Sequence, residues 1–192
     1  MIILLDTDYL ARIEVITGCM KSGKTDELIR RLERAQIAGY NILVFKPAQD
    51  DRFSETEIVS RSGRKFECFR VNNLKESIPF IKEKCDVIGL DEIQFFNDNL
   101  HKICQEIADS GVRVIASGLS TDFQRKPFMS TMNLISIAEK VDKLSAICEC
   151  GSNAYFTQRI DSNGNAILSG DKVMVGDDEY RPRCRKCFIS QG

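Results

Sequence analysis

The sequence contains a complete phosphate-binding motif, Gly18-Cys-Met-Lys-Ser-Gly-Lys-Thr25, which matches the pattern G-x-x-x-x-G-K-[ST]. The motif follows a predicted strand at residues 12–17 and opens a predicted helix at 25–38. An ordinary glycine turn is the alternative, and these flanks disfavour it. Glycines let main-chain N–H groups approach a phosphate, and the start of a helix favours negative charge. Lys24 can contact the β- and γ-phosphates of a nucleotide, and the Thr25 hydroxyl can bind Mg²⁺. The predicted nucleotide-binding residues of this loop are Gly18, Cys19, Met20, Lys21, Ser22, Gly23, Lys24 and Thr25.

An acidic pair, Asp91-Glu92, follows the apolar predicted strand 86–90. Ligands of open α/β sheets bind at the carboxyl ends of the strands. Asp91 is therefore predicted to hold Mg²⁺, directly or through water, and Glu92 to act as a base beside the γ-phosphate. An acidic pair that closes a strand is usually a solvated turn, so the phosphate-binding motif is what favours a catalytic role. The predicted nucleotide-binding region extends over Asp91, Glu92, Ile93 and Gln94.

The base could deprotonate water, as in an ATPase, or a substrate hydroxyl, as in a kinase. The choice depends on a pocket for a second substrate, and aromatic residues are the candidates. Phe95 and Phe96 follow the acidic pair, while Phe123 and Phe128 follow the next predicted strand, residues 112–116. Rings at this edge could stack on a planar base, which is worth roughly 1–3 kcal/mol per base. For any one of these phenylalanines considered alone, a place in the hydrophobic core is at least as plausible as a role in binding a base.

Four of the eight cysteines form two clusters, Cys148-Glu-Cys150 and Cys184-Arg-Lys-Cys187. Four thiolates typically form a closed, tetrahedral structural zinc site. No export signal is apparent, so we expect a cytoplasmic protein, and in a reducing compartment clustered cysteines bind metal more often than they form disulfides. Four reduced, unliganded thiols are the alternative. The sequence thus predicts structural Zn²⁺ on Cys148, Cys150, Cys184 and Cys187, and Mg²⁺ on Thr25 and Asp91.

Apolar runs alternate with amphipathic stretches over residues 12–145, which predicts a mostly parallel sheet with helices on both faces. Further predicted elements are a strand at 42–45 and helices at 74–83 and 100–108. Residues 49–65 are polar and predicted to form a mobile hairpin or loop. Short β-prone pieces follow at 155–160, 166–168 and 172–175. Two units are therefore expected, a nucleotide-binding α/β domain at 1–145 and a zinc-binding β subdomain at 146–192.

Composition argues against several classes of protein. The 192 residues include 27 Lys and Arg against 28 Asp and Glu, for a formal net charge of −1. Such a balance produces no strong field toward nucleic acid or membranes. The apolar runs are too short to span a bilayer. We expect neither a nucleic-acid partner nor a membrane partner.

The ordered set of motifs resembles the zinc-containing type II thymidine kinase family. The resemblance covers residues 12–189 and implies a P-loop (RecA-like) parallel sheet flanked by helices, with a small C-terminal zinc-binding β subdomain. Cys19, Lys21, Arg61 and the single residue between Cys148 and Cys150 depart from the usual family pattern. The matching segments are 18–25, Asp91-Glu-Ile-Gln-Phe-Phe96, Gly118-Leu-Ser-Thr-Asp-Phe-Gln-Arg-Lys-Pro-Phe128, Ser60-Arg-Ser-Gly63 and Tyr180-Arg-Pro-Arg-Cys-Arg-Lys-Cys187.

The resemblance implies transfer of the γ-phosphate of ATP to the 5′-hydroxyl of deoxythymidine, giving dTMP and ADP in nucleotide salvage. By position, Glu92 matches the general base, and Asp50 and Arg52 match an acidic-x-Arg element near the reacting phosphate. The implied catalytic residues are Glu92, Lys24, Arg52 and Asp50. The implied thymidine-binding residues, which include part of a closing lasso loop, are Met20, Phe95, Leu119, Phe123, Phe128, Val173, Met174, Val175, Gly176 and Tyr180.

The family further implies a homotetramer and feedback inhibition by thymidine triphosphate. Two other classes remain as alternatives from the residues. One is a RecA-like ATPase motor, which would hydrolyse ATP without a nucleoside. The other is a zinc-bearing nucleotide- or nucleic-acid-binding module without activity. A guanine-nucleotide switch is disfavoured because the sequence has no Asn-Lys-x-Asp element.

Overall fold

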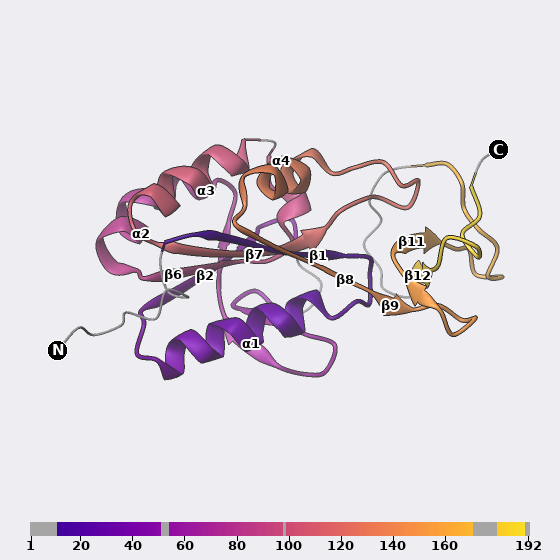
Figure 1. Ribbon diagram of the computed structural model, residues 1–192, viewed down its shortest axis with the longest axis horizontal. Helices are drawn as coiled ribbons and strands as arrows, with labels where there is room; N and C mark the ends of the chain where they lie inside the picture. Colours follow the sequence, from indigo (N-terminus) through magenta and orange to yellow (C-terminus); the bar gives the residue numbers. More distant parts are fainter. Residues whose placement is uncertain (1–10, 51–53, 98, 171–179, 191–192) are drawn as a thin grey trace.

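The computed structural model describes residues 11–50, 54–97, 99–170 and 180–190. Its centre is a six-stranded sheet in the order β5-β2-β6-β7-β1-β8, and all neighbouring strands are parallel (Figure 1). The strands are β1 (Ile13–Gly18), β2 (Ile42–Pro47), β5 (Phe69–Val71), β6 (Val87–Leu90), β7 (Arg113–Leu119) and β8 (Lys140–Leu144). The predicted α/β class with a parallel sheet is confirmed.

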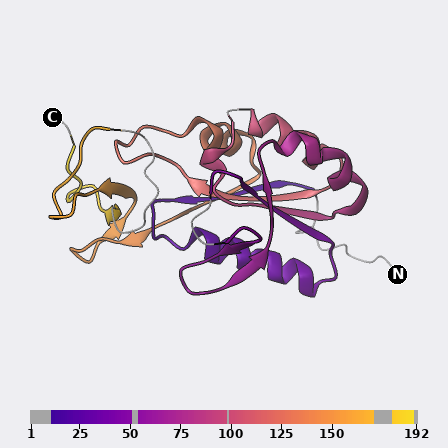
Figure 2. The ribbon, with the colours of Figure 1, turned by 180° about the vertical axis from the view of Figure 1, so that it is seen from behind.

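Helices cover both faces of the sheet. The helix α1 (Lys24–Ile37) lies on one face, and α2 (Ile78–Lys84), α3 (Leu100–Asp109) and α4 (Met129–Ile137) lie on the other (Figures 1 and 2). Alternate strand residues supply two cores: Ile16 and Ile115 pack with Leu28 and Leu32 of α1, whereas Val114 packs on the opposite side. Burial on both faces explains why the central strands β6 and β7 are almost continuously apolar.

The predicted helix at 74–83 is wrong in part. Residues Leu74–Ser77 form a 3₁₀ helix, η2, and α2 begins only at Ile78. Pro79 lies in the first turn of α2. Because proline has no N–H to donate, it is compatible with the start of an α-helix and disfavours one that begins a turn earlier.

The polar segment that follows β2 contains a hairpin, as predicted. Strands β3 (Glu57–Val59) and β4 (Lys65–Glu67) pair antiparallel, and Ile58 is buried in the same core as α1. The turn is tied to α1 by hydrogen bonds from Ser62 to Asp26 and from Arg64 to Glu33. The hairpin therefore rests on the helix that follows the phosphate-binding motif.

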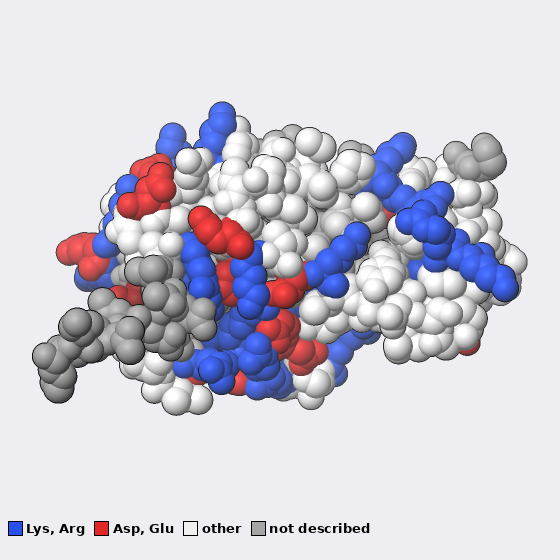
Figure 3. Space-filling view, in the orientation of Figure 1, with Lys and Arg blue, Asp and Glu red and all other residues white. Residues whose placement is uncertain are grey.

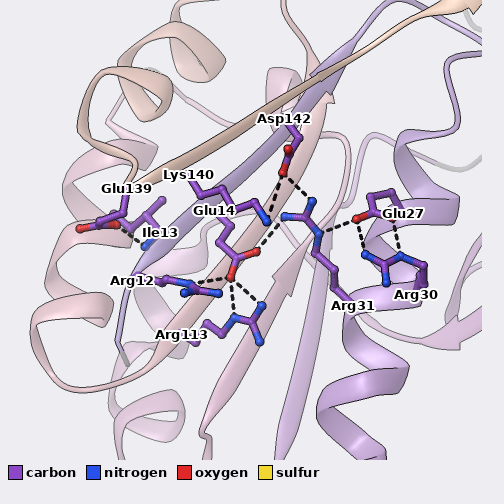
Figure 4. Close-up of polar contacts among 10 residues, drawn as sticks. All are labelled: Arg12, Ile13, Glu14, Glu27, Arg30, Arg31, Arg113, Glu139, Lys140 and Asp142. Carbon is purple, nitrogen blue, oxygen red and sulfur yellow. Dashed lines mark hydrogen bonds and ion pairs between the residues drawn. The ribbon is translucent and has the colours of Figure 1, made fainter. Parts of the chain in front are cut away.

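A buried charged network joins α1 to the sheet (Figure 4). Glu14 of β1 is 1% exposed and pairs with Arg12, Arg31 and Arg113 at 2.6–2.8 Å. Arg31 also contacts Asp142 of β8 at 2.6 Å. Burial alone would raise the pKa of Glu14, but the guanidinium groups of Arg113 and Arg12 lower it below its ordinary value. The network fixes how α1 sits on β1, β7 and β8.

The C-terminal lobe follows β8 directly and lies beyond the carboxyl ends of the sheet strands (Figure 1). It consists of two short antiparallel ladders, which pair β9 (Ala146–Ile147) with β10 (Asn153–Ala154) and β11 (Phe156–Arg159) with β12 (Tyr180–Arg183). The predicted strand at 166–168 is reduced to one bridge, from Ile160 to Ala166. The predicted strand at 172–175 lies outside the described residues. The division of the chain at residue 145 stays a prediction.

Cationic side chains fasten this lobe to the loop after β7. Arg125 lies 4.6 Å from the ring centre of Phe188 and 5.5 Å from that of Phe156.

On the face shown in Figure 3, both signs of charge are interspersed over the α/β part, whereas basic side chains prevail over the lobe at the right. Among the described residues, no helix is both long and apolar enough to cross a bilayer.

Candidate nucleotide-binding and active site

The phosphate-binding loop connects β1 to α1 with little free space. A Cβ atom at Gly18 would lie 2.5 Å from the Leu144 carbonyl oxygen and 2.6 Å from Ser22 Oγ, so only glycine fits. Gly23 precedes the helix in a left-handed conformation, with φ 82°. Lys24 Nζ donates to the Cys19 carbonyl oxygen at 2.9 Å, so the lysine amine lies over the loop. This is the arrangement that the motif predicts.

Asp91 ends β6 beside this loop. Thr25 Oγ1 donates to Asp91 Oδ2 at 3.2 Å, and Ser117 Oγ and the Glu92 N–H donate to Asp91 Oδ1. Burial, with the nearby Glu92 charge, raises the pKa of Asp91 to about 6. A hydroxyl and a carboxylate are oxygen ligands of the kind that Mg²⁺ prefers. Thr25 and Asp91 therefore fit the predicted magnesium site.

Glu92 has left-handed backbone angles, φ 52° and ψ 44°. This conformation is costly for a residue other than glycine, and residues held in it cluster at functional sites. The Glu92 carboxylate accepts a hydrogen bond from Gln94 Nε2, and Gln94 Oε1 accepts one from the Leu119 N–H at 3.0 Å. Gln94 thereby holds the candidate base against the end of β7.

Close packing on β7 fixes the turn that carries Glu92. The turn continues into η3 (Ile93–Phe95), a single 3₁₀ turn. A Cβ atom at Gly118 would lie 2.5 Å from Ile93 Cγ1 and 2.7 Å from Gln94 Oε1. Glycine at position 118 is therefore what allows the turn to lie this close to the strand.

One cavity joins the phosphate-binding loop to the candidate base and the aromatic residues. Its empty volume, counted with the open mouth, is about 1090 Å³. Glu92 and Asp50 line it together with the loop and the C-terminal lobe. Six of the residues expected to bind the nucleoside also line it, namely Met20, Phe95, Leu119, Phe123, Phe128 and Tyr180.

Some predicted site residues either do not line the cavity or fall outside the described residues. Gly18, Cys19, Ser22 and Ile93 are not among the described residues that line the cavity, and Cys19 and Ile93 are buried behind it. Arg52 and the stretch Val173, Met174, Val175 and Gly176 lie outside the described residues, so their assigned roles stay predictions.

Sequence reasoning missed several lining residues. Lys46, at the end of β2, is 2% exposed, and its Nζ donates to the carbonyl oxygen of Glu57 at 3.2 Å. The signal available in the sequence was a lysine at the carboxyl end of an apolar strand. Arg61 comes from the turn between β3 and β4. The lining residues without a prior role are Asp26, Lys46, Glu57, Ile58, Val59, Arg61, Thr121, Asp122 and Thr157.

The four clustered cysteines meet in the C-terminal lobe. The Sγ atoms of Cys148, Cys150, Cys184 and Cys187 all lie within 4.8 Å of one another, and the Cys150–Cys184 pair is 3.6 Å apart. Tetrahedral zinc with Zn–S bonds near 2.3 Å requires S–S separations of about 3.8 Å. The cysteines therefore fit a zinc ion, and the one-residue spacer in Cys148-Glu-Cys150 does not prevent both thiols from reaching the cluster.

The phosphate-binding loop, the Thr25–Asp91 pair and the aromatic-lined cavity define a P-loop enzyme that binds a nucleotide. The family model described as thymidine kinase matches residues 11–188. The chain belongs to the thymidine kinase family, which confirms the resemblance found in the sequence. It is thus an ATP-dependent nucleoside kinase of a family whose reaction is the phosphorylation of thymidine, with use of a nucleotide and Mg²⁺.

Proposed function

We propose that this chain transfers the γ-phosphate of ATP to the 5′-hydroxyl of deoxythymidine, giving dTMP and ADP in nucleotide salvage. The observation that carries the proposal is that Lys24, Glu92 and Phe123 line one cavity. A phosphate donor on the loop and a nucleoside among the aromatic side chains would then meet beside the carboxylate.

Each group has a role that its position supports. Lys24 and the loop N–H groups bind the β- and γ-phosphates, and Glu92 accepts the proton of the attacking hydroxyl. Thr25 and Asp91 would hold Mg²⁺, which would supply positive charge against the charge of the phosphates. Phosphoryl transfer depends mostly on positioning and charge neutralisation, and the rigid turn at Glu92 suits that requirement.

Further charged residues belong to the proposed phosphate end of the site. Asp50 lines it, and Arg52 follows two residues later in the sequence. We assign both to the neighbourhood of the reacting phosphate. Arg61, in the hairpin that is hydrogen-bonded to α1, lines the cavity and supports binding of a polyphosphate.

The nucleoside end of the cavity is apolar and aromatic. Met20 would pack against the thymine ring, with Phe123, Phe128 and Tyr180 around it. Leu119 and Phe95 close the pocket, and residues 173–176 would cover it as a lasso loop. A structural zinc on the four cysteines would hold the strand that carries Tyr180, because Cys184 follows β12 directly.

Family membership also supports a homotetramer, inhibition by thymidine triphosphate and a cytoplasmic location. We therefore include the homotetramer, the inhibition and the location in the proposal of a salvage enzyme.

A panel of nucleosides tests the proposal. The zinc-loaded protein is incubated with ATP and Mg²⁺ and each of the common nucleosides in turn, and nucleoside monophosphates are measured by chromatography. Thymidine should give the largest kcat/KM. If ATP is hydrolysed at the same rate with and without every nucleoside, the chain is an ATPase and the proposal is wrong.

A further inference from the structure

Two consecutive residues of the phosphate-binding loop donate hydrogen bonds to the C-terminal lobe. Cys19 Sγ donates to the Ala154 carbonyl oxygen at 3.3 Å, and the Met20 N–H donates to Thr157 Oγ1 at 3.0 Å. Ala154 ends β10 and Thr157 lies in β11. Cys19, Ala154 and Thr157 are all buried, at 3% exposure or less. The loop therefore rests on the lobe through contacts that exclude water.

The same lobe contains the cysteine cluster, and Cys19 packs against it. Cys19 shares one buried core with Ala146, Cys148, Ala154 and Cys184. Its side chain thus lies on the far side of the loop from the cavity. A change in the packing of Cys148 or Cys184 would therefore reach the phosphate-binding loop at Cys19.

The peptide group between Cys19 and Met20 is held from both ends. Its carbonyl oxygen accepts the bond from Lys24 Nζ at 2.9 Å, and its N–H donates to Thr157 Oγ1 at 3.0 Å. A peptide group is planar, so fixing the N–H also fixes the direction of the carbonyl. The Thr157 hydroxyl therefore sets the orientation of the group that contacts the predicted phosphate-binding lysine.

We propose that Thr157 and Cys19 are positioning residues that couple the cysteine lobe to nucleotide binding by fixing the Cys19–Met20 peptide. The inference rests on one part of the proposed function, namely that ATP binds at this loop. Metal on the four cysteines then acts on the triphosphate site as well as on the lobe, although none of these cysteines lines the cavity among the described residues.

The test measures ATP binding without any nucleoside, by calorimetry with ATP and Mg²⁺ on zinc-loaded protein of verified metal content. Thr157→Val removes the acceptor at nearly constant volume, Thr157→Ser restores it, and Cys19→Ala removes the thiol on the side away from the cavity. We expect the Kd for ATP to rise about three- to tenfold in Thr157→Val and Cys19→Ala, as for the loss of one neutral hydrogen bond, and to stay near wild type in Thr157→Ser. Cys104→Ala, in the core beside α3, is the matched control: it also loses a buried thiol and should bind ATP normally.

Hydrogen exchange gives a second measurement that does not depend on a variant folding. Amides of residues 18–25 should exchange faster when a chelator removes the metal from the wild-type protein, while those of α3 should not change. Unchanged ATP affinity in Thr157→Val and Cys19→Ala, or unchanged exchange at 18–25 after metal removal, would overturn the inference. If the variants behave as expected but thymidine acquires no phosphate, only the proposed function fails.

Discussion

The Thr25 hydroxyl lies 3.2 Å from a carboxylate oxygen of Asp91, although 66 residues separate them in the sequence. Thr25 is in the first turn of α1, and Asp91 directly follows β6. The contact exists because parallel strands end at the same edge of the sheet, which brings the segments after β1 and β6 together. The remaining site residues are arranged around this pair.

Glu92→Gln should retain ATP binding and lower kcat by two or more orders of magnitude, because the amide cannot accept the substrate proton. Steady-state kinetics and calorimetry check the two parts separately. Glu83→Gln, on an exposed position of α2, is the control and should leave both unchanged. Turnover near that of the wild type in Glu92→Gln would remove this residue from the role of base.

Gly118→Ala should lower kcat at least tenfold. The added methyl group would overlap Ile93 and Gln94 and displace the turn that carries Glu92. Gly89→Ala is the comparison, since its Cβ would meet only the flexible Leu32 and Val44 side chains at 3.0–3.3 Å. Overpacking of this kind costs about 1–3 kcal/mol of stability. Equal losses of kcat in the two variants, measured well below their melting temperatures, would show that displacement of the turn is not the cause.

Metal analysis should find about one zinc per chain. Cys184→Ser should lose the metal and lower the melting temperature, because structural zinc contributes directly to folding. Atomic spectroscopy and thermal unfolding measure the two effects. Cys68→Ser, at a buried cysteine outside the cluster, should keep the zinc. A wild-type chain that is fully folded without metal would contradict the structural role.

Acid stability should depend on Glu27. Hydrogen bonds from Arg30 and Arg31 lower the pKa of Glu27 from 4.5 to about 2. The folded state binds this proton less readily than the unfolded state, so the stabilisation is complete above pH 4.5 and is lost as the pH falls toward 2. In urea unfolding, Glu27→Gln should be less stable than wild type at pH 7, and the difference should shrink at pH 3. A difference that is independent of pH would contradict this assignment.

The sequence predicted the central elements because their physical signals are local. Strands β1, β2 and β6 are buried apolar runs, and α1 has a regular apolar face. Strand β8 was not predicted, because it lies at the edge of the sheet, its side chains are largely exposed, and three of its five residues are charged, so Lys140–Leu144 contains no apolar run. Periodicity alone predicted one helix over residues 74–83. Pro79 instead lies in the first turn of α2, which begins at Ile78.

For the candidate site, the motifs located the phosphate-binding loop, the acidic pair and the cysteines, which the fold then brought together. The sequence did not predict residues that reach the cavity only through tertiary contacts. Arg61 arrives because Ser62 and Arg64 tie the hairpin to α1. Thr157 arrives because the C-terminal lobe packs on the loop at Met20. Neither residue belongs to a local pattern that indicates nucleotide binding.

The central claim is that the hydroxyl beside Glu92 receives the terminal phosphate of ATP. Transfer of label from γ-³²P-ATP tests it most directly, with thymidine and 5′-deoxythymidine as paired acceptors that differ only at the 5′ position. We predict label in thymidine monophosphate, no labelled product from 5′-deoxythymidine, and loss of the thymidine product in Glu92→Gln. Equal labelling of both acceptors, or release of label only as inorganic phosphate, would contradict the account.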